Sequence, residues 1–455
     1  MPPPKITSSE IDLKTPQREK SAWMFALRAL GYRNYRLFFG GQSISLIGTW
    51  MTKIATSWLV YRLTGSAFLL GIVGFAGQIP TFALAPFAGV WIDRWDRHRT
   101  LVVTQVLSMV QSLALAGLAL GGVITVSEII WLSLVQGLIN AFDVPARQAF
   151  VVEMIEGRED LGNAIALNSS MVNAARLVGP AVAGVLIAGV GEGYCFLIDG
   201  ISYIAVIIAL LAMKITRNST LELPPKAMWH DLREGWSHVV HSAPIRSVLL
   251  LLALVSLVGM PYTVLMPIFA GSVLHGGPHT LGFLMGATGV GALAAAIFLA
   301  TRKTVLGLGR IIPISAAVFG AGLIGFSFSR TLPLSLLLIL ISGGGMMEQM
   351  AASNTILQTI VDDDKRGRVM SSYSMAFMGM APFGSLLAGS AATHIGTPNT
   401  LLVGGILCLG GAAWFALYLP AIREAVRPIY RRLGILPEIT QAMETVSLLQ
   451  IPPED

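Results

Sequence analysis

The sequence Gly89-Val90-Trp91-Ile92-Asp93-Arg94-Trp95-Asp96-Arg97-His98-Arg99 lies between two long apolar segments. A loop with so many charged side chains must lie in water, so the flanking segments are predicted to be antiparallel membrane helices joined by a tight elbow. Gly89 permits close approach of a neighbouring helix, and Arg94, Arg97 and Arg99 would hold the elbow on one side of the bilayer. The alternative is that these arginines are topology anchors and nothing more.

Composition also indicates that the chain as a whole is a membrane protein. Hydrophobic residues make up 54% of the 455 residues and charged residues only 12%, about half the charged share of a typical soluble domain. This balance is typical of a polytopic membrane protein. Cys195 and Cys408 both lie in apolar stretches, so neither a disulfide framework nor a metal site is predicted, and no cofactor is expected.

The apolar segments predict twelve spans. They lie near residues 37–62, 67–91, 100–122, 126–147, 161–190, 194–214, 246–274, 279–301, 308–328, 332–357, 368–393 and 398–420. The expected fold class is an all-α membrane protein with twelve transmembrane helices in two six-helix bundles related by a pseudo-two-fold axis. The expected order is an N-terminal tail (1–36), a first bundle (37–214), a linker with an amphipathic helix (215–245), a second bundle (246–420) and a C-terminal tail (421–455).

Positive charge gives this arrangement an orientation. Of the 31 Lys and Arg residues, all but Lys53, Arg62, Arg176 and Arg330 fall on the side that holds the N-terminus. Such a bias predicts that both termini lie in the cytoplasm. It also accounts for the net charge of +6 without a nucleic-acid partner.

Weak internal repeats support two halves of equal orientation. Leu63-Thr64-Gly65-Ser66 is echoed by Leu274-His275-Gly276-Gly277, each directly after the first span of its half. Parallel repeats of this kind are found in transporters whose substrate site lies near the bilayer midplane, between the repeats.

Two motifs make the chain resemble the major facilitator superfamily, and within it the bacterial branch that includes the enterobactin exporter. The elbow matches the signature loop of that superfamily at Gly89, Asp93, Arg94, Arg97 and Arg99, with Asp96 where Gly is usual. The second motif, Gly179-Pro180-Ala181-Val182-Ala183-Gly184, resembles the Gly-Pro motif associated with exporters. Ser133 stands where many proton-driven exporters carry an Arg, so coupling through that arginine is not implied. The resemblance further implies that the protein lies in the plasma (inner) membrane of a bacterium, and that Asp93 faces the N-terminal end of the eleventh span, near Arg368.

The Gly-Pro motif suggests a mechanism. Pro180 removes a backbone donor in mid-span, while Gly179 and Gly184 thin one helix face, so this helix can bend and pack closely. Its expected counterpart is the segment Ala381-Pro382-Phe383-Gly384, with which it would form a rocking seam for alternating access. The alternative is that Pro and Gly are simply common in membrane helices.

Charged residues inside spans are the candidates for substrate binding or ion coupling, because each costs about 2.5–3.5 kcal/mol at the centre of a membrane helix. Lys53, Arg176, Asp199 and Glu348 are the clearest cases. Arg176 is as suited to bridging helices as to binding substrate. Glu348 has no obvious local partner in the sequence and would be able to take up and release a proton, the alternative being a buried structural hydrogen bond.

Asp143 lies near the end of the predicted fourth span. Pro145 suggests that the helix ends there, so Asp143 is expected to form a pair with Arg147 at the cytoplasmic rim.

These features predict a monomeric secondary transporter that exports a small amphipathic or hydrophobic compound, such as a drug or siderophore-like metabolite, with protons as the coupling ion. The alternatives are an importer of the same fold and a non-transporting sensor or assembly factor. An enzyme is not expected, because the chain has no phosphate-binding loop and no recognisable catalytic triad.

Overall fold

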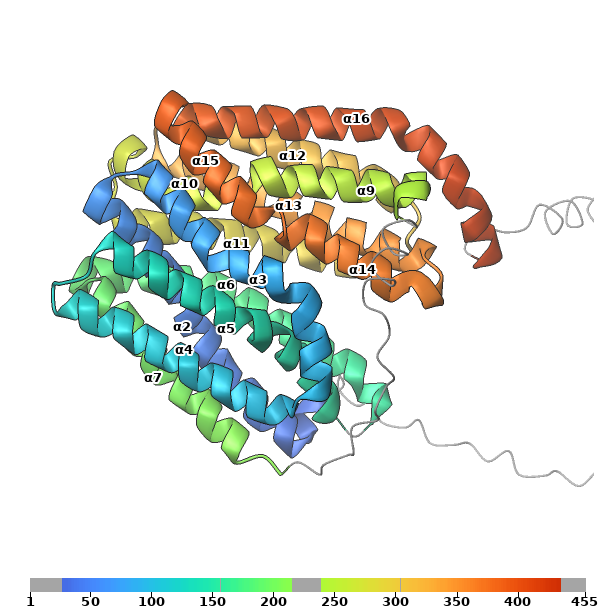
Figure 1. Cartoon of the computed structure of the whole chain (residues 1–455). Helices are drawn as coiled ribbons and strands as arrows, with labels where there is room; N and C mark the ends of the chain where they lie inside the picture. The colour runs from blue at the N-terminus through green and yellow to red at the C-terminus, as the bar shows by residue number, and fades with distance from the viewer. Residues whose placement is uncertain (1–26, 156, 215–238, 303, 435–455) are drawn as a thin grey trace, which may run out of the picture.

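The computed structural model describes residues 27–155, 157–214, 239–302 and 304–434; the side chains of residues 85, 86, 89, 90, 93, 158, 363 and 364 lie outside the described part. The described chain is helical throughout (Figure 1). Its α-helices are α2 (Arg33–Thr64), α3 (Ala67–Arg94), α4 (Arg97–Leu120), α5 (Val126–Glu153), α6 (Leu161–Val190), α7 (Glu192–Leu211), α9 (Ala243–Leu254), α10 (Tyr262–Ile268), α11 (Pro278–Ala300), α12 (Leu308–Phe328), α13 (Leu332–Ile360), α14 (Asp363–Met378), α15 (Ala381–Ile395) and α16 (Thr397–Arg432). The amphipathic helix predicted in the linker falls largely on residues 215–238, outside the described residues.

Within the described residues, eleven helices or helical runs are long and apolar enough to cross a membrane. Two of these runs combine several elements: 243–273 contains α9 and α10, and 365–395 contains α14 and α15. Helix α2 is a twelfth helix, 32 residues long and interrupted by polar side chains. The chain is therefore an all-helical membrane protein with the expected number of spanning segments.

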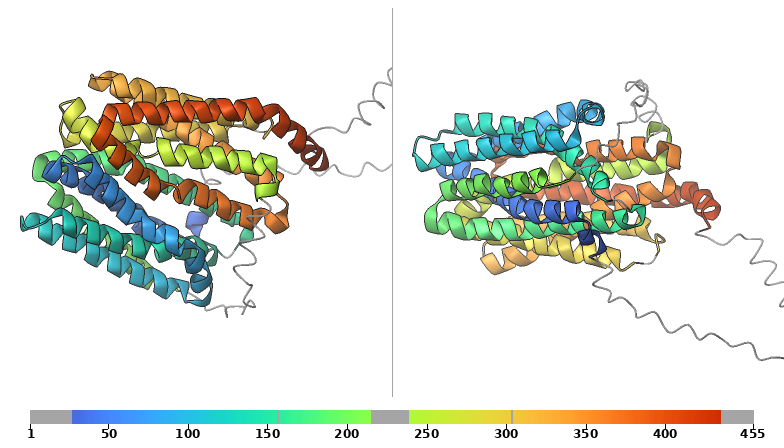
Figure 2. Two further views of the ribbon diagram at one scale, coloured as in Figure 1. Left: turned by 45° about the horizontal axis from the view of Figure 1, so that its top comes forward. Right: turned by 90° about the horizontal axis from the view of Figure 1, so that it is seen from below.

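The helices form two halves that lie side by side, α2–α7 in blue to green and α9–α16 in yellow-green to red (Figures 1 and 2). In the first half, α2 packs against α6 and α7, α3 against α5, and α4 against both α5 and α7. In the second half, α12 packs against α13 and α16, and α11 against α13. Every spanning helix thus buries one face against neighbours and leaves apolar side chains for lipid on another.

Glycine makes the same tight turn in both halves. Gly191 (φ 94°) joins α6 to α7, and Gly396 (φ 82°) joins α15 to α16. Side chains other than Gly rarely adopt such positive φ values. Since both glycines lie between the fifth and sixth spans of their halves, they add a backbone argument to the weak sequence repeat.

Helix boundaries differ from the sequence-based expectation at two places. Pro145 does not end α5, which continues to Glu153. Helix α16 continues through Pro420 and Pro428 to Arg432. A proline removes one donor and kinks a helix, but neighbouring helices can hold the kinked segment in place.

Basic residues gather at one end of the bundle, which is called the basic end below. It holds the α3–α4 elbow and the ends of the neighbouring helices, with Arg33, Arg94, Arg97, Arg147, Lys214, Arg246, Arg302, Arg310, Lys365 and Arg431. The short turns after α2, α6 and α15 lie at the opposite end, on the left of Figure 1.

Candidate functional site

The first contact between the halves is a seam of small residues between α6 and α11. A Cβ atom added at Gly282 would lie 2.8 Å from the carbonyl oxygen of Pro180 and 3.0 Å from Cα of Gly184. The two backbones therefore touch, which only glycine permits at this distance. Two glycines of the exporter-like motif have different roles, because Gly184 faces the other half whereas Gly179 accommodates Trp50 of α2.

The second seam joins α3 to α15. A Cβ atom added at Gly389 would lie 2.9 Å from Cα of Gly71. Further along, Phe82 packs edge-on against Phe383, with ring centroids 5.4 Å apart. The prediction that α6 pairs with the segment 381–384 is therefore wrong: α6 pairs with α11, and that segment pairs with α3.

These contacts gather away from the basic end. Tyr61, near the end of α2, is hydrogen-bonded to Ser272 of the other half (3.0 Å), and α10 packs against α2 and α3. The contacts of α3 with α15 described above extend from Gly71 to Phe82, whereas α3 itself continues to Arg94. Towards the basic end, on the right of Figure 1, the two halves diverge.

Two cations lie at mid-span beside one aromatic ring. Lys53 Nζ lies 4.4 Å from the centroid of the Trp50 ring, and Arg176 Cζ lies 5.2 Å from the centroid of the same tryptophan. The Lys53 side chain is exposed, whereas that of Arg176 is half-buried.

Asp199 of α7 is a buried acid, 2% exposed. Its Oδ2 accepts hydrogen bonds from Thr52 Oγ1 (2.8 Å) and Ser112 Oγ (3.0 Å). Its Oδ1 has no hydrogen-bond partner among the described residues. A Cβ atom at position 48 would lie 2.6 Å from Oδ1, so Gly48 leaves the room that this carboxyl occupies.

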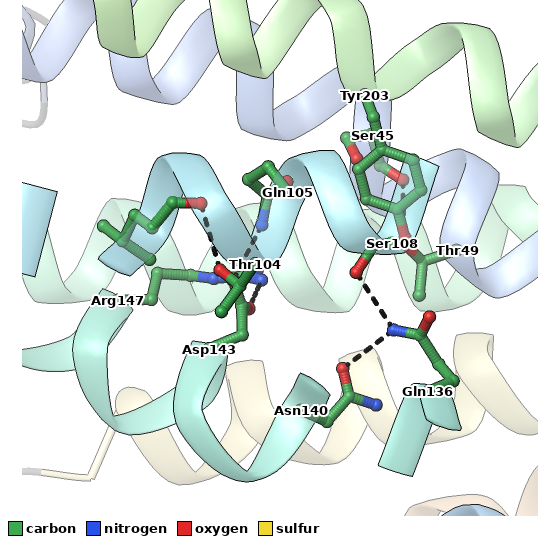
Figure 3. Close-up of polar contacts among 11 residues, drawn as sticks. Ser45, Thr49, Thr104, Gln105, Ser108, Gln136, Asn140, Asp143, Arg147 and Tyr203 are labelled. Carbon is green, nitrogen blue, oxygen red and sulfur yellow. Dashed lines mark hydrogen bonds and ion pairs between the residues drawn. The ribbon is translucent and has the colours of Figure 1, made fainter. Parts of the chain in front are cut away.

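Asp143 lies in a polar network between α4 and α5 (Figure 3). Its Oδ1 accepts hydrogen bonds from Thr104 Oγ1 (2.8 Å) and Gln105 Nε2 (2.7 Å). Its Oδ2 forms an ion pair with Arg147, one turn along α5. With its lone pairs used in this way and 2% exposure, Asp143 ties two helices together and is less suited to binding substrate or carrying protons.

Glu348 of α13 is half-buried, and its Oε2 accepts a hydrogen bond from Ser315 Oγ of α12 (3.0 Å). The sequence offers Glu348 no local partner, and the structure gives it one from another helix, as in the alternative of a structural hydrogen bond. Sequence reasoning missed Ser315 because the two residues meet only when α12 packs against α13.

The elbow is bound within the first half. Asp96 caps α4 by accepting a hydrogen bond from the backbone N–H of Arg99 (3.1 Å), and their side chains lie 3.6 Å apart. Arg97 forms an ion pair with Glu153 at the end of α5 (2.7 Å). The Arg94 side chain is exposed.

Aromatic packing reinforces the elbow. Trp91, Trp95 and Phe142 form a stacked group with centroids 5.8–6.2 Å apart. The surroundings of Gly89 and Asp93, and hence the predicted approach of Asp93 to the eleventh span, lie outside the described side chains.

Sequence reasoning missed the role of Trp50, Thr52 and Gly282. Trp50 lies one helical turn before Lys53 in α2, and Thr52 directly precedes Lys53. A polar and an aromatic side chain this close to a charged residue in a membrane helix could have indicated that they interact. Gly282 carried no such signal, because membrane helices contain many glycines.

The two halves, their parallel order and the small-residue seams define a transporter of the major facilitator class. The chain belongs to the transmembrane secretion effector family of the major facilitator superfamily, whose model matches residues 26–438. This match confirms the resemblance noted in the sequence. The members of this superfamily are transporters and not enzymes.

Three related proteins are similar in sequence to this chain over most of their own length. The staphyloferrin A transporter of Staphylococcus aureus is 28% identical over 84% of this chain and 95% of the relative. The multidrug efflux pump Tap of Mycolicibacterium fortuitum is 26% identical over 83% and 93%. The macrolide efflux protein A of Streptococcus pyogenes is 25% identical over 86% and 98%.

Solved structures agree in fold. A nucleoside transporter superposes with a TM-score of 0.66 at 11% identity, covering 86% of this chain and 99% of that one. A bacterial homologue of ferroportin in an inward-facing state superposes with a TM-score of 0.64 at 15% identity, covering 86% and 98%.

Proposed function

We propose that this secondary transporter exports a small amphipathic or hydrophobic compound, drug-like or siderophore-like, from the cytoplasm of a bacterium. The basic end faces the cytoplasm in this proposal, in keeping with the bias of Lys and Arg towards it. The chain works as a monomer, since one chain supplies both halves.

The observation that carries the proposal is the placement of the seams between the halves. The close contacts at Gly184 with Gly282 and at Gly71 with Gly389 lie away from the basic end. The halves would therefore be closed towards the outside and divergent towards the cytoplasm, ready to receive a cytoplasmic compound. Rocking about these seams would then open the opposite end. Kinship with efflux proteins supports the outward direction.

Protons are the proposed coupling ion, and Asp199 is the proposed carrier. Asp199 is buried, it has no ion-pair partner among the described residues, and one of its carboxyl oxygens is unpartnered. Thr52, which donates a hydrogen bond to Asp199, directly precedes Lys53 in α2. A change in the protonation of Asp199 would therefore alter the surroundings of Lys53. Glu348, which accepts a hydrogen bond from Ser315, is the second candidate.

Export is tested by expressing the chain in an efflux-deficient bacterial strain and measuring accumulation of a panel of fluorescent dyes and siderophores. Expression should lower accumulation of at least one compound relative to empty vector. Higher accumulation on expression would contradict export and favour import.

Coupling is tested in inverted membrane vesicles with an acidified interior. Asp199→Asn should lose accumulation driven by the pH gradient while it keeps exchange of labelled for unlabelled compound. Glu348→Gln is the matched control and should keep most of the driven accumulation. The opposite pattern would move the coupling role to Glu348.

A further inference from the structure

The central cations Lys53 and Arg176 lie at similar depth in two neighbouring helices. At 1.5 Å per residue, Lys53 is about 17 Å from the end of α2 at Thr64, and Arg176 is about 21 Å from the end of α6 at Val190. Both are therefore close to the middle of a hydrocarbon layer about 30 Å thick.

Their position is set by close packing. A Cβ atom at Gly179 would lie 2.5 Å from Cβ of Trp50, so α6 holds the tryptophan tightly against α2. Lys53 and Arg176 both lie over Trp50. Repulsion between two like charges at mid-span adds to the cost of placing them there.

Neither cation has an acidic partner in the part of the chain that the structure describes. Among the described residues, the structure gives no ion pair or hydrogen bond for either side chain, and Nε of Arg176 is buried without an acceptor. The nearby acids are engaged elsewhere, Asp199 by Thr52 and Ser112 and Asp143 by Arg147. Cation–π contacts contribute about 0.5–2 kcal/mol, less than the cost of placing two charges at mid-span.

Two arginines that lie nearer the ends of their helices do have acidic partners. Arg62 forms two hydrogen bonds with the buried Glu192, at 2.8 and 3.2 Å. Arg147 is paired with Asp143. Among the described residues, Lys53 and Arg176 differ from these two arginines, because they lie at mid-span without an acid beside them.

The second half borders this pair. Leu177, the neighbour of Arg176, packs against Gly289 of α11. An anion held by the two cations would thus lie at the boundary between the halves, where alternating access requires the substrate to bind.

We infer that Lys53 and Arg176 bind an acid group of the transported compound, so that the substrate class is an organic anion such as a carboxylate. This inference rests on the proposed function and deepens it. The carboxylate would supply the missing negative charge and accept hydrogen bonds from the ammonium and the guanidinium, while Trp50 offers a flat apolar wall for the rest of the molecule.

The experiment uses the purified full chain and two probes of equal size, 1-naphthoate and 1-naphthamide, with thermal unfolding as the readout of binding. The acid should raise the unfolding temperature and the amide should not. Lys53→Met and Arg176→Met should each lower the apparent affinity for the acid by about tenfold or more, the loss of one charge-assisted hydrogen bond. Equal effects of acid and amide, or an unchanged acid effect in both variants, would overturn the inference.

Inorganic phosphate is the third probe. If phosphate stabilises the chain as well as naphthoate does at equal concentration, the pair binds a free inorganic anion and the inference about substrate fails.

Stability without any probe separates this role from a structural one. Lys53→Met and Arg176→Met should unfold at the same temperature as the natural chain or higher, because each removes an uncompensated charge. Arg62→Met is the matched control and should lower stability, since it strands buried Glu192. A fall in stability in both central variants as large as that of Arg62→Met would assign the pair to structure.

Failure of this inference is distinguishable from failure of the proposed function. Export that persists unchanged in Lys53→Met and Arg176→Met would refute the anion site alone, whereas no export of any compound by the natural chain would refute the function.

Discussion

Gly282→Ala should open the end of the protein opposite the basic end. The added Cβ would lie 2.8 Å from the Pro180 carbonyl oxygen and 3.0 Å from Cα of Gly184. Both are backbone atoms, which cannot turn aside as a flexible side chain does. In any conformation in which the two halves are closed at this end, the seam between α6 and α11 must therefore widen.

The expected magnitude follows from this overlap. Forcing an extra methyl group into close packing costs about 1–3 kcal/mol, and that energy changes a two-state equilibrium about 5- to 150-fold. The cost falls on the conformation with the closed seam, so the outward-open conformation should gain population. Gly286→Ala is the matched control on the same helix, because a Cβ atom there has nothing within 4 Å.

The assay is distance measurement between spin labels. One pair of labels at Val123 and Arg330, both in turns at the end opposite the basic end, should show a longer distance or a second, longer population in Gly282→Ala. A pair at Val152 and Leu306, near the basic end, should show a shorter distance or a second, shorter population. The two natural cysteines, Cys195 and Cys408, are both buried and should not react with the label.

The control and the refuting outcome are equally specific. Gly286→Ala should keep the distances and the transport rate of the natural chain. Identical distance distributions in Gly282→Ala and Gly286→Ala would refute the idea that the α6–α11 seam closes this end.

Three further predictions concern the second seam, the polar network and the elbow. Gly389→Ala, whose Cβ would lie 2.7 Å from the Ala67 carbonyl oxygen, should shift the same label distances in the same direction as Gly282→Ala. Asp143→Asn should destabilise the protein by about 3–5 kcal/mol, because it breaks a buried ion pair, and adding Arg147→Met should restore part of the unfolding temperature; no recovery would argue against the pair as the cause. Asp96→Ala should cost about 1 kcal/mol through loss of the α4 cap, measured by chemical unfolding, whereas no loss would mean that the Arg99 backbone N–H finds water instead.

The class of protein could be predicted from the sequence because its evidence is local. A span requires about 20 consecutive apolar residues and a charged loop must lie in water, so segment lengths and the elbow at 89–99 carry the information without any tertiary contact. The same holds for the intramembrane charges: Lys53, Arg176 and Asp199 stand out because each is expensive where it lies.

Pairing between segments was decided by tertiary structure alone. Many glycines on membrane helices permit close approach, and only the packed structure shows that Gly184 meets Gly282 while the segment near Phe383 meets α3. Polar partners follow the same rule, since Ser315 reaches Glu348 only because α12 and α13 pack together. The free-energy cost of placing a charged residue in a membrane can be predicted from the sequence. The group that compensates this cost comes from another helix and is known only from the tertiary structure.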